Sequence, residues 1–182
     1  MEPWIETRTG RRIDLRYPHE SDICLDDVAH ALGHICRYTG HSSIYYSVAE
    51  HCVRASMLVP TDAALATLLH DAHEAYVGDV SSPLKSLVPD YRRIEDEMER
   101  VVFTALMGRL PNEYEARHIK QADVAMLRME AEAMMDSQGR EWPILQGVAI
   151  GYDFVAPGWG PEVARWRWKD RFLELTRKDG WK

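Results

Sequence analysis

Apolar residues recur at helical spacing along most of this chain, and this periodicity constrains the fold more than any other feature of the sequence. It predicts helices over residues 26–34, 43–58, 61–77, 90–107, 115–136 and 161–177. Thr61 follows a proline and is expected to cap the third helix, which Gly78 should end. Residues 4–8 and 12–15 flank a Thr-Gly-Arg turn, a pattern typical of a small β-hairpin. The sequence therefore predicts a predominantly α-helical fold, with residues 139–160 as a loop.

The composition fits an ordinary globular domain and argues against one class of function. The chain has 182 residues, of which 46% are hydrophobic and 28% charged. This length is enough for one hydrophobic core and too short for two domains of ordinary size. Lys and Arg total 22 against 29 Asp and Glu, which gives a net charge of −7. A protein whose main task is binding nucleic acid needs a concentrated positive surface. We therefore expect a single domain over residues 1–182 and no nucleic-acid partner.

Three further features of the sequence indicate where in the cell the protein is expected. The apolar runs are shorter than the roughly 20 residues that a membrane span needs, and the first residues lack the basic and apolar regions of a signal peptide. Cys24, Cys36 and Cys52 are odd in number and lack C-x-x-C spacing. This usage is typical of a reducing compartment rather than of a disulfide framework. We expect a cytoplasmic protein without membrane contact.

His70, Asp71 and Glu74 stand at the end of the apolar stripe of the helix predicted over residues 61–77. On a helix, residues four apart such as His70 and Glu74 share a face, and Asp71 lies about 100° round from His70. An ionised carboxylate beside leucines is costly unless a partner neutralises it, and a divalent cation is an effective partner. The alternative is a group of solvated acids at a helix end.

Two more segments carry ligand-type residues on apolar helix faces. His51 has Val48 and Cys52 on neighbouring positions, where a lone histidine can also be a hydrogen-bonded core residue. Asp123 and Glu130 occupy a stripe where leucines would be expected, unless the register is shifted and both face solvent. The three segments together favour a metal site assembled from three helices.

The order His51, then His70-Asp71, then Asp123, with Glu74 and Asp79 after the doublet, resembles the HD-domain phosphohydrolase superfamily. The similarity runs from residue 7 to about 136. The segments over 35–41 (ICRYTGH) and 78–85 (GDVSSPLK) are similar to its small single-domain branch. That branch includes the YfbR-type deoxynucleoside 5′-monophosphatases and the phage DatZ-type dATP triphosphohydrolases. The length and the Thr-Arg-Thr-Gly opening at 7–10 resemble the DatZ type more closely.

This resemblance implies an all-α HD-domain helical bundle that holds one divalent metal ion. The implied ligands are His51, His70, Asp71 and Asp123. Two imidazoles and two carboxylates suit Mn²⁺, Co²⁺, Fe²⁺, Ni²⁺ or Zn²⁺ without choosing among them, and Mg²⁺ could accompany the substrate phosphates. The resemblance also gives catalytic parts to Glu74, which would orient or deprotonate the attacking water, and to Asp79.

The implied substrate-binding residues lie in two segments: Arg37, Tyr38, His41, Pro83 and Lys85. Arg37 matches the family's phosphate- or sugar-contacting arginine, and Lys85 is expected near the opening of the same site. Either residue could instead be a solvated surface charge. Tyr38 stands where the monophosphatases carry a tryptophan, so an aromatic ring is retained for stacking. His41 is a candidate phosphate contact. Pro83 is either part of a base pocket or only a turn residue.

The favoured function is a metal-dependent dNTP triphosphohydrolase that prefers dATP and releases deoxynucleoside and triphosphate. The alternative within the superfamily is a 5′-deoxynucleotidase that hydrolyses dNMPs. A non-catalytic nucleotide-binding module is disfavoured because Glu74 and Asp79 accompany all four ligands. Trp166 and Trp168 lie among basic residues and could form a nucleic-acid stacking surface, but their spacing favours a final helix packed on the bundle or on a partner subunit. Both related groups imply a homo-oligomer.

Overall fold

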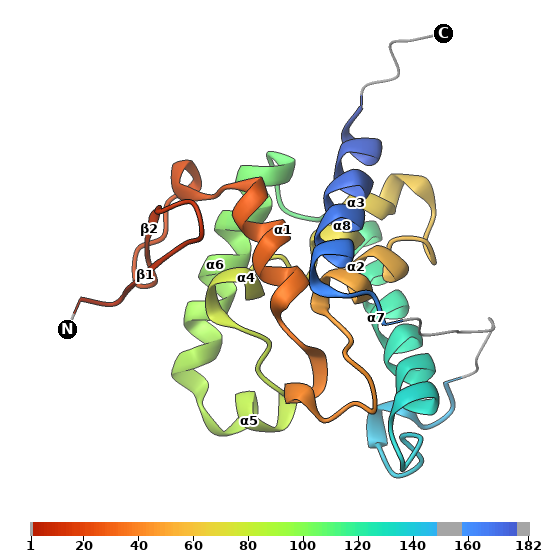
Figure 1. Ribbon diagram of the computed structural model, residues 1–182. Coiled ribbons are helices and arrows are strands. Elements are labelled where there is room, and N and C mark those ends of the chain that lie inside the picture. The colour runs from red at the N-terminus through yellow and green to blue at the C-terminus, as the bar shows by residue number, and fades with distance from the viewer. Residues whose placement is uncertain (1, 149–157, 178–182) are drawn as a thin grey trace, which may run out of the picture.

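The computed structural model describes residues 2–148 and 158–177, and it confirms an all-α fold with a small N-terminal hairpin (Figure 1). The antiparallel strands are β1 (Trp4–Glu6) and β2 (Arg12–Asp14). The helices are α1 (Leu25–His34), α2 (Val48–Ala55), α3 (Thr61–Leu69), α4 (Glu74–Val77), α5 (Ser82–Leu87), α6 (Pro89–Met107), α7 (Glu113–Met134) and α8 (Pro161–Thr176), with 3-10 turns η1 (Glu20–Asp22), η2 (Arg37–Gly40) and η3 (Pro143–Leu145). Within the described ranges, no helix combines the length and the apolar character that crossing a membrane requires.

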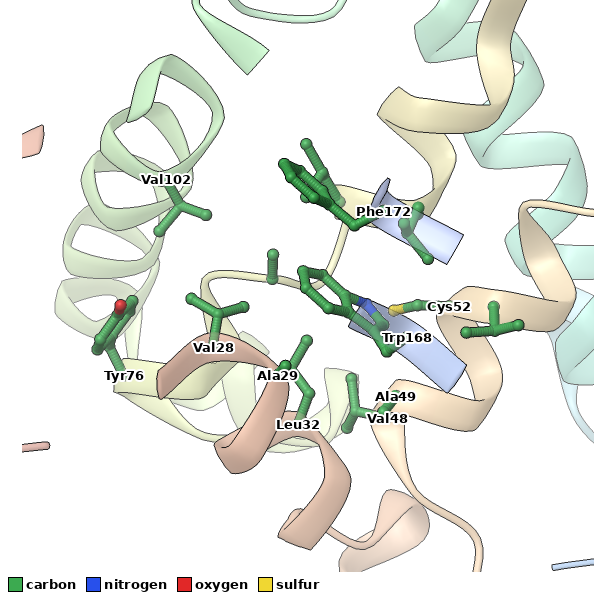
Figure 2. Close-up of a cluster of buried hydrophobic side chains, with 14 of the residues drawn as sticks. Val28, Ala29, Leu32, Val48, Ala49, Cys52, Tyr76, Val102, Trp168 and Phe172 are labelled. Carbon is green, nitrogen blue, oxygen red and sulfur yellow. The ribbon is translucent and has the colours of Figure 1, made fainter. Parts of the chain in front are cut away.

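The core forms where α8 packs across α1 and α2. Trp168 of α8 is fully buried, and Figure 2 shows it between Val28, Ala29 and Leu32 of α1 and the side chains of α2. Its ring stacks on that of Phe172, with centroids 6.0 Å apart. Trp168 is therefore a core residue, as the helical spacing favoured, whereas Trp166 on the same helix is 55% exposed.

A second, smaller apolar cluster fixes α7 against α2. Ala55 of α2 packs with Ala122, Met126 and Met129 of α7. Because these residues recur every three or four positions on α7, the same helical face also carries Asp123 and Glu130 toward α2. The packing of α7 thus brings two acidic residues to the side chains of α2.

The helix predicted over residues 61–77 is wrong as a continuous element, because α3 ends at Leu69 and α4 begins only at Glu74. In an unbroken helix the carbonyl of Thr67 would accept the backbone N–H of the fourth residue on. Here the His70 Nδ1 lies 2.7 Å from that carbonyl oxygen, and the turn tightens through the bond from the Ala72 N–H to the Leu69 carbonyl. His70 and Glu74 therefore do not share one helix face. Thr61 is also the first helical residue rather than the N-cap, which is Pro60.

The helix predicted over 43–58 is shorter than expected, since α2 begins at Val48. Its N-cap is Ser47, whose hydroxyl accepts the Glu50 N–H at 3.1 Å. The residues before it are extended, because the Val48 N–H donates to the Ile35 carbonyl and the Arg37 N–H to the Tyr46 carbonyl. This pairing closes a loop that carries η2. The sequence also missed α5, which has Pro83 in its first turn.

The start of α7 is fixed by a capping box that the sequence analysis did not place. Asn112 accepts the Glu115 N–H at 3.0 Å, and the Glu115 carboxylate accepts the Asn112 N–H at 2.8 Å. Arg109 adds two hydrogen bonds of 2.7 Å to the same carboxylate. The helix therefore begins at Glu113, two residues earlier than predicted.

We expect Glu115→Ala to lower the free energy of unfolding by about 1–2 kcal/mol at neutral pH, and Glu115→Gln by less, because glutamine can keep the capping box. Arg109 holds the pKa of Glu115 below its usual range. The charge-dependent stabilisation is therefore present above the ordinary glutamate pKa, about 4.3, and is lost as pH falls through the lower folded-state pKa. Urea unfolding at pH 7 and in acid measures both effects. If the loss of unfolding free energy in Glu115→Gln is as large in acid as at pH 7, the charge of Glu115 does not contribute to stability.

Candidate active site

The middle of α2, the turn after α3 and the middle of α7 bring the four predicted metal ligands together. The His51 Nε2 lies 3.3 Å from the His70 Nε2, 3.7 Å from the Asp71 Oδ2 and 3.4 Å from the Asp123 Oδ1. The Asp71 Oδ2 is 3.2 Å from the His70 Nε2. His51, His70 and Asp71 form the tightest group, with one donor atom of each within 4.8 Å of the others. Asp123 lies at its edge, and its side chain is 43% exposed.

The outer nitrogens of both imidazoles are already engaged. The His51 Nδ1 lies 2.6 Å from the Glu130 Oε1, and the His70 Nδ1 contacts the Thr67 carbonyl. An imidazole that donates through Nδ1–H presents the lone pair of its Nε2. Two such lone pairs then face each other beside the Asp71 carboxylate, an arrangement that fits a divalent transition-metal ion.

Glu130 joins the metal-type ligands to the predicted substrate-binding residues. It is fully buried, and its carboxylate accepts hydrogen bonds from the Arg37 Nε at 3.2 Å and from the Tyr38 hydroxyl at 2.6 Å, besides contacting His51. Its place in an apolar stripe indicated a buried acid, but no sequence pattern indicated these three partners. One carboxylate thus orients an imidazole, a guanidinium and a phenol.

Replacing Glu130 by glutamine should lower metal affinity by about 10- to 100-fold, the usual cost of removing a hydrogen-bond partner of a metal ligand. Tyr38→Phe removes one of the same contacts without touching His51, so it should leave metal affinity unchanged. Metal titration and steady-state kinetics on both variants check this. Equal metal affinity in Glu130→Gln and the wild type would show that His51 does not need this partner.

Arg37 and Tyr38 are held by a strained turn. Tyr38 and Thr39 have φ angles of 56° and 53°, in the left-handed region, which costs about 1–2 kcal/mol per residue. The backbone pairing of Arg37 with Tyr46 and the bonds to Glu130 hold this geometry. The turn so held presents the buried Arg37 to the cluster, where its Nη1 lies 3.5 Å from the Asp71 Oδ2.

Glu74 and Asp79 lie beside the ligand group. Glu74 is buried, and its Oε2 has no hydrogen-bond partner in the described part of the chain. Burial and the charges of Asp71 and Asp79 raise the pKa of Glu74 well above its usual range. Burial also raises the pKa of Asp79, with the Arg37 charge opposing it. Both carboxylates are therefore poised to take or hold a proton, and a bound cation would shift them toward the ionised form.

The other predicted substrate-binding residues lie at different distances from the group of candidate metal ligands. Lys85 on α5 forms an ion pair with Glu95 of α6, which the His73 Nε2 approaches at 3.4 Å. The charges of Glu74 and Asp71 also act on Lys85, so it lies at the edge of the site. His41, at the end of η2, and Pro83 are both exposed, and no contact within the described residues joins either to the cluster.

Comparison with known proteins agrees with this arrangement. Residues 43–136, which include all four candidate ligands, match the family described as 5′-deoxynucleotidase YfbR-like. The chain is 36% identical over 173 residues to the uncharacterized protein YfdR of Escherichia coli K12, covering 95% of this chain and 96% of that protein. It is also 36% identical over 141 residues to an uncharacterized protein of Rhodobacter capsulatus, covering 71% of each. The chain therefore belongs to the YfbR-like 5′-deoxynucleotidase family of HD-domain, metal-dependent phosphohydrolases.

Proposed function

We propose that this chain hydrolyses the 5′-phosphate of free 2′-deoxynucleoside monophosphates, with His51, His70, Asp71 and Asp123 as ligands of one divalent transition metal. The observation that carries the proposal is the pair of Nε2 atoms, 3.3 Å apart, whose outer nitrogens are both engaged. When bound, such an ion lowers the pKa of water and polarises a phosphoryl oxygen. The metal could be Mn²⁺, Co²⁺, Fe²⁺, Ni²⁺ or Zn²⁺, because the ligand set suits each of them.

The remaining residues supply the proton transfers and hold the phosphate. Glu74, with a free buried oxygen, receives the proton of the attacking water, and Asp79 gives or holds a second proton for the leaving deoxyribose oxygen. Arg37 binds the phosphate oxygens from the buried side, since Glu130 fixes its Nε and leaves its other nitrogens toward Asp71. Lys85 attracts the phosphate from the edge. Tyr38 offers its ring to the sugar or base.

The supply of positive charge favours a monophosphate. The described site contributes Arg37 and Lys85, and both are already paired with carboxylates. A triphosphate carries more negative charge and would need further cations, such as Mg²⁺, in a cluster that already contains Asp71, Glu74, Asp79, Asp123 and Glu130. The monophosphatase is also the activity in the family's description.

The structure also gives the Thr-Arg-Thr-Gly opening a structural role. Thr7 and Thr9 donate hydroxyl hydrogen bonds of 2.8 and 2.6 Å to the Asp27 carboxylate on α1, and the Thr9 N–H donates to it at 3.0 Å. This motif ties the hairpin to α1. Because the motif has this structural role, it is weaker support for a triphosphohydrolase than its resemblance alone. The dATP triphosphohydrolase is the second candidate, supported by the chain length and by that resemblance.

One assay separates the two candidates. The purified protein is incubated with Mn²⁺, Co²⁺, Fe²⁺, Ni²⁺ or Zn²⁺ in turn and with a panel of dNMPs, dNTPs and NTPs, and the products are identified by chromatography. Orthophosphate and deoxynucleoside from dNMPs are expected. Triphosphate release from dATP, with dAMP left intact, would establish the second candidate instead. No turnover of any nucleotide with any of the five metals would overturn both.

The proposal includes a single domain over residues 1–182 that acts as a homo-oligomer in the cytoplasm, with no nucleic acid or membrane as partner. Val163, Trp166 and Leu173 support self-association, because all three are exposed apolar residues on α8, at 47%, 55% and 39%. Light scattering at assay concentrations measures the mass. A monomer that is fully active would contradict the oligomer.

A further inference from the structure

A second group of metal-type ligands lies where α1 meets the beginning of α8. His30 and His34 are one turn apart on α1, and Glu162 is in the first turn of α8. One donor atom of each residue lies within 4.8 Å of those of the other two. The candidate active site takes its residues from other elements. The third ligand follows far along the chain, so no local motif marks this group.

The orientation of the two imidazoles suits metal binding. The His34 Nδ1 lies 2.8 Å from the His30 carbonyl oxygen, so the Nε2 presents its lone pair; this atom is 4.0 Å from the Glu162 Oε1. The two rings lie 4.1 Å apart, tilted by 35°. The His30 Nδ1 is buried without a hydrogen-bond partner among the described residues, which is costly for a polar atom.

The backbones of the two helices approach each other closely at this point. A Cβ on Gly33 would lie 2.7 Å from the Pro161 carbonyl oxygen and 3.1 Å from the Arg165 Cβ. The absence of a side chain at Gly33 thus permits the close approach that sets Glu162 beside His34. Since Trp168 anchors α8 in the core, the three ligands are mounted on rigid elements.

The surrounding charges restrict which ion fits. The charges of Arg8 and Arg165 both act on His30. Arg165 pairs with the Glu162 Oε2 at 3.1 Å and leaves Oε1 toward His34. The guanidinium groups repel cations, so charge alone would not hold Ca²⁺ or Mg²⁺ here. Imidazole coordination favours Zn²⁺, Ni²⁺ or Cu²⁺.

We propose that His30, His34 and Glu162 bind a second divalent transition-metal ion, which joins α1 to the beginning of α8. A ligand that binds only the folded state shifts the folding equilibrium toward it. At a free metal concentration of 100 times the Kd, the ratio of folded to unfolded protein rises about 100-fold. The ion therefore stabilises the docking of α8, and it takes no part in the hydrolysis.

The test counts Zn²⁺ ions per chain in untagged protein by equilibrium dialysis and elemental analysis. The wild type is compared with His34→Ala and with the matched control His118→Ala, which removes an exposed helical histidine whose Nδ1 also faces a carbonyl one turn back, at 2.9 Å. Two ions are expected in the wild type and in His118→Ala, and one in His34→Ala. A count that is the same in the wild type and in His34→Ala overturns the proposal, whatever the total in the wild type.

Thermal unfolding supplies the second readout. Without metal, His34→Ala and the wild type should unfold at similar temperatures, which shows that the exposed substitution leaves the fold intact. Zn²⁺ should raise the unfolding temperature of the wild type more than that of His34→Ala. Both proteins should hydrolyse substrate at the same rate. Loss of turnover in His34→Ala would place the group in the catalytic machinery and overturn a purely stabilising site. An inactive wild type that still binds a His34-dependent ion would refute only the proposed function.

Discussion

Replacing Asp71 by asparagine should lower turnover by at least about 10³-fold and abolish stoichiometric metal binding at the active site. The Asp71 carboxylate lies near the Nε2 atoms of both imidazoles, with its Oδ2 3.2 Å from the His70 Nε2 and 3.7 Å from the His51 Nε2. The metal supplies several kcal/mol of transition-state stabilisation, and about 4 kcal/mol corresponds to a factor of about 10³ in rate. Metal content and kcat measured on the same preparation check the expectation.

Asp123→Asn serves as the matched control. Asp123 is the other proposed carboxylate ligand, but its side chain is 43% exposed and it lies outside the tightest group. Its loss should therefore weaken metal binding and turnover less than the loss of Asp71 does. Circular dichroism in EDTA shows whether each variant is folded. A folded Asp71→Asn protein with near-normal kcat and full metal content would disprove the ligand assignment.

The sequence predicted the helical parts of the fold where an apolar stripe faces one packed surface. The helices over 90–107 and 161–177 agree with α6 and α8 to within a residue. The prediction failed where a side chain or a distant backbone segment takes the backbone groups that a helix would use. The His70 imidazole takes the carbonyl that would continue α3, and the pairing of residues 35–37 with 46–48 delays α2. Periodicity carries no information on such competition.

The sequence indicated which candidate ligands could come together, but it did not indicate the contacts that hold them in place. An acid or a histidine on an apolar face is visible in the sequence, which is why His51 and Asp123 could be paired with the doublet. The partners of Glu130 come from η2, whose left-handed Tyr38 and Thr39 no residue preference would suggest. The ion pair of Lys85 with Glu95 likewise depends on how α5 turns back on α6. Contacts between distant segments set these features.

Glu74→Gln should keep the metal and lower kcat by about 10²- to 10⁴-fold, the range for losing a general base or acid. Burial and the charges of Asp71 and Asp79 raise the pKa of Glu74, so in the absence of metal this side chain binds a proton readily. Glutamine matches its shape but cannot accept and release that proton. Because Glu74 is not a proposed ligand, metal content and KM should change little, in contrast to Asp71→Asn.

The control is Glu132→Gln, which removes a partly exposed carboxylate paired with Arg128 on α7 and should leave kcat close to the wild-type value. The profile of kcat against pH gives a second readout. In the wild type the activity should fall in acid as Glu74 takes up a proton, and Glu74→Gln should lose this acid limb along with its rate. An unchanged acid limb in Glu74→Gln, or a kcat within a few-fold of the wild type, would assign the proton transfer to another group, with Asp79 the next carboxylate to test.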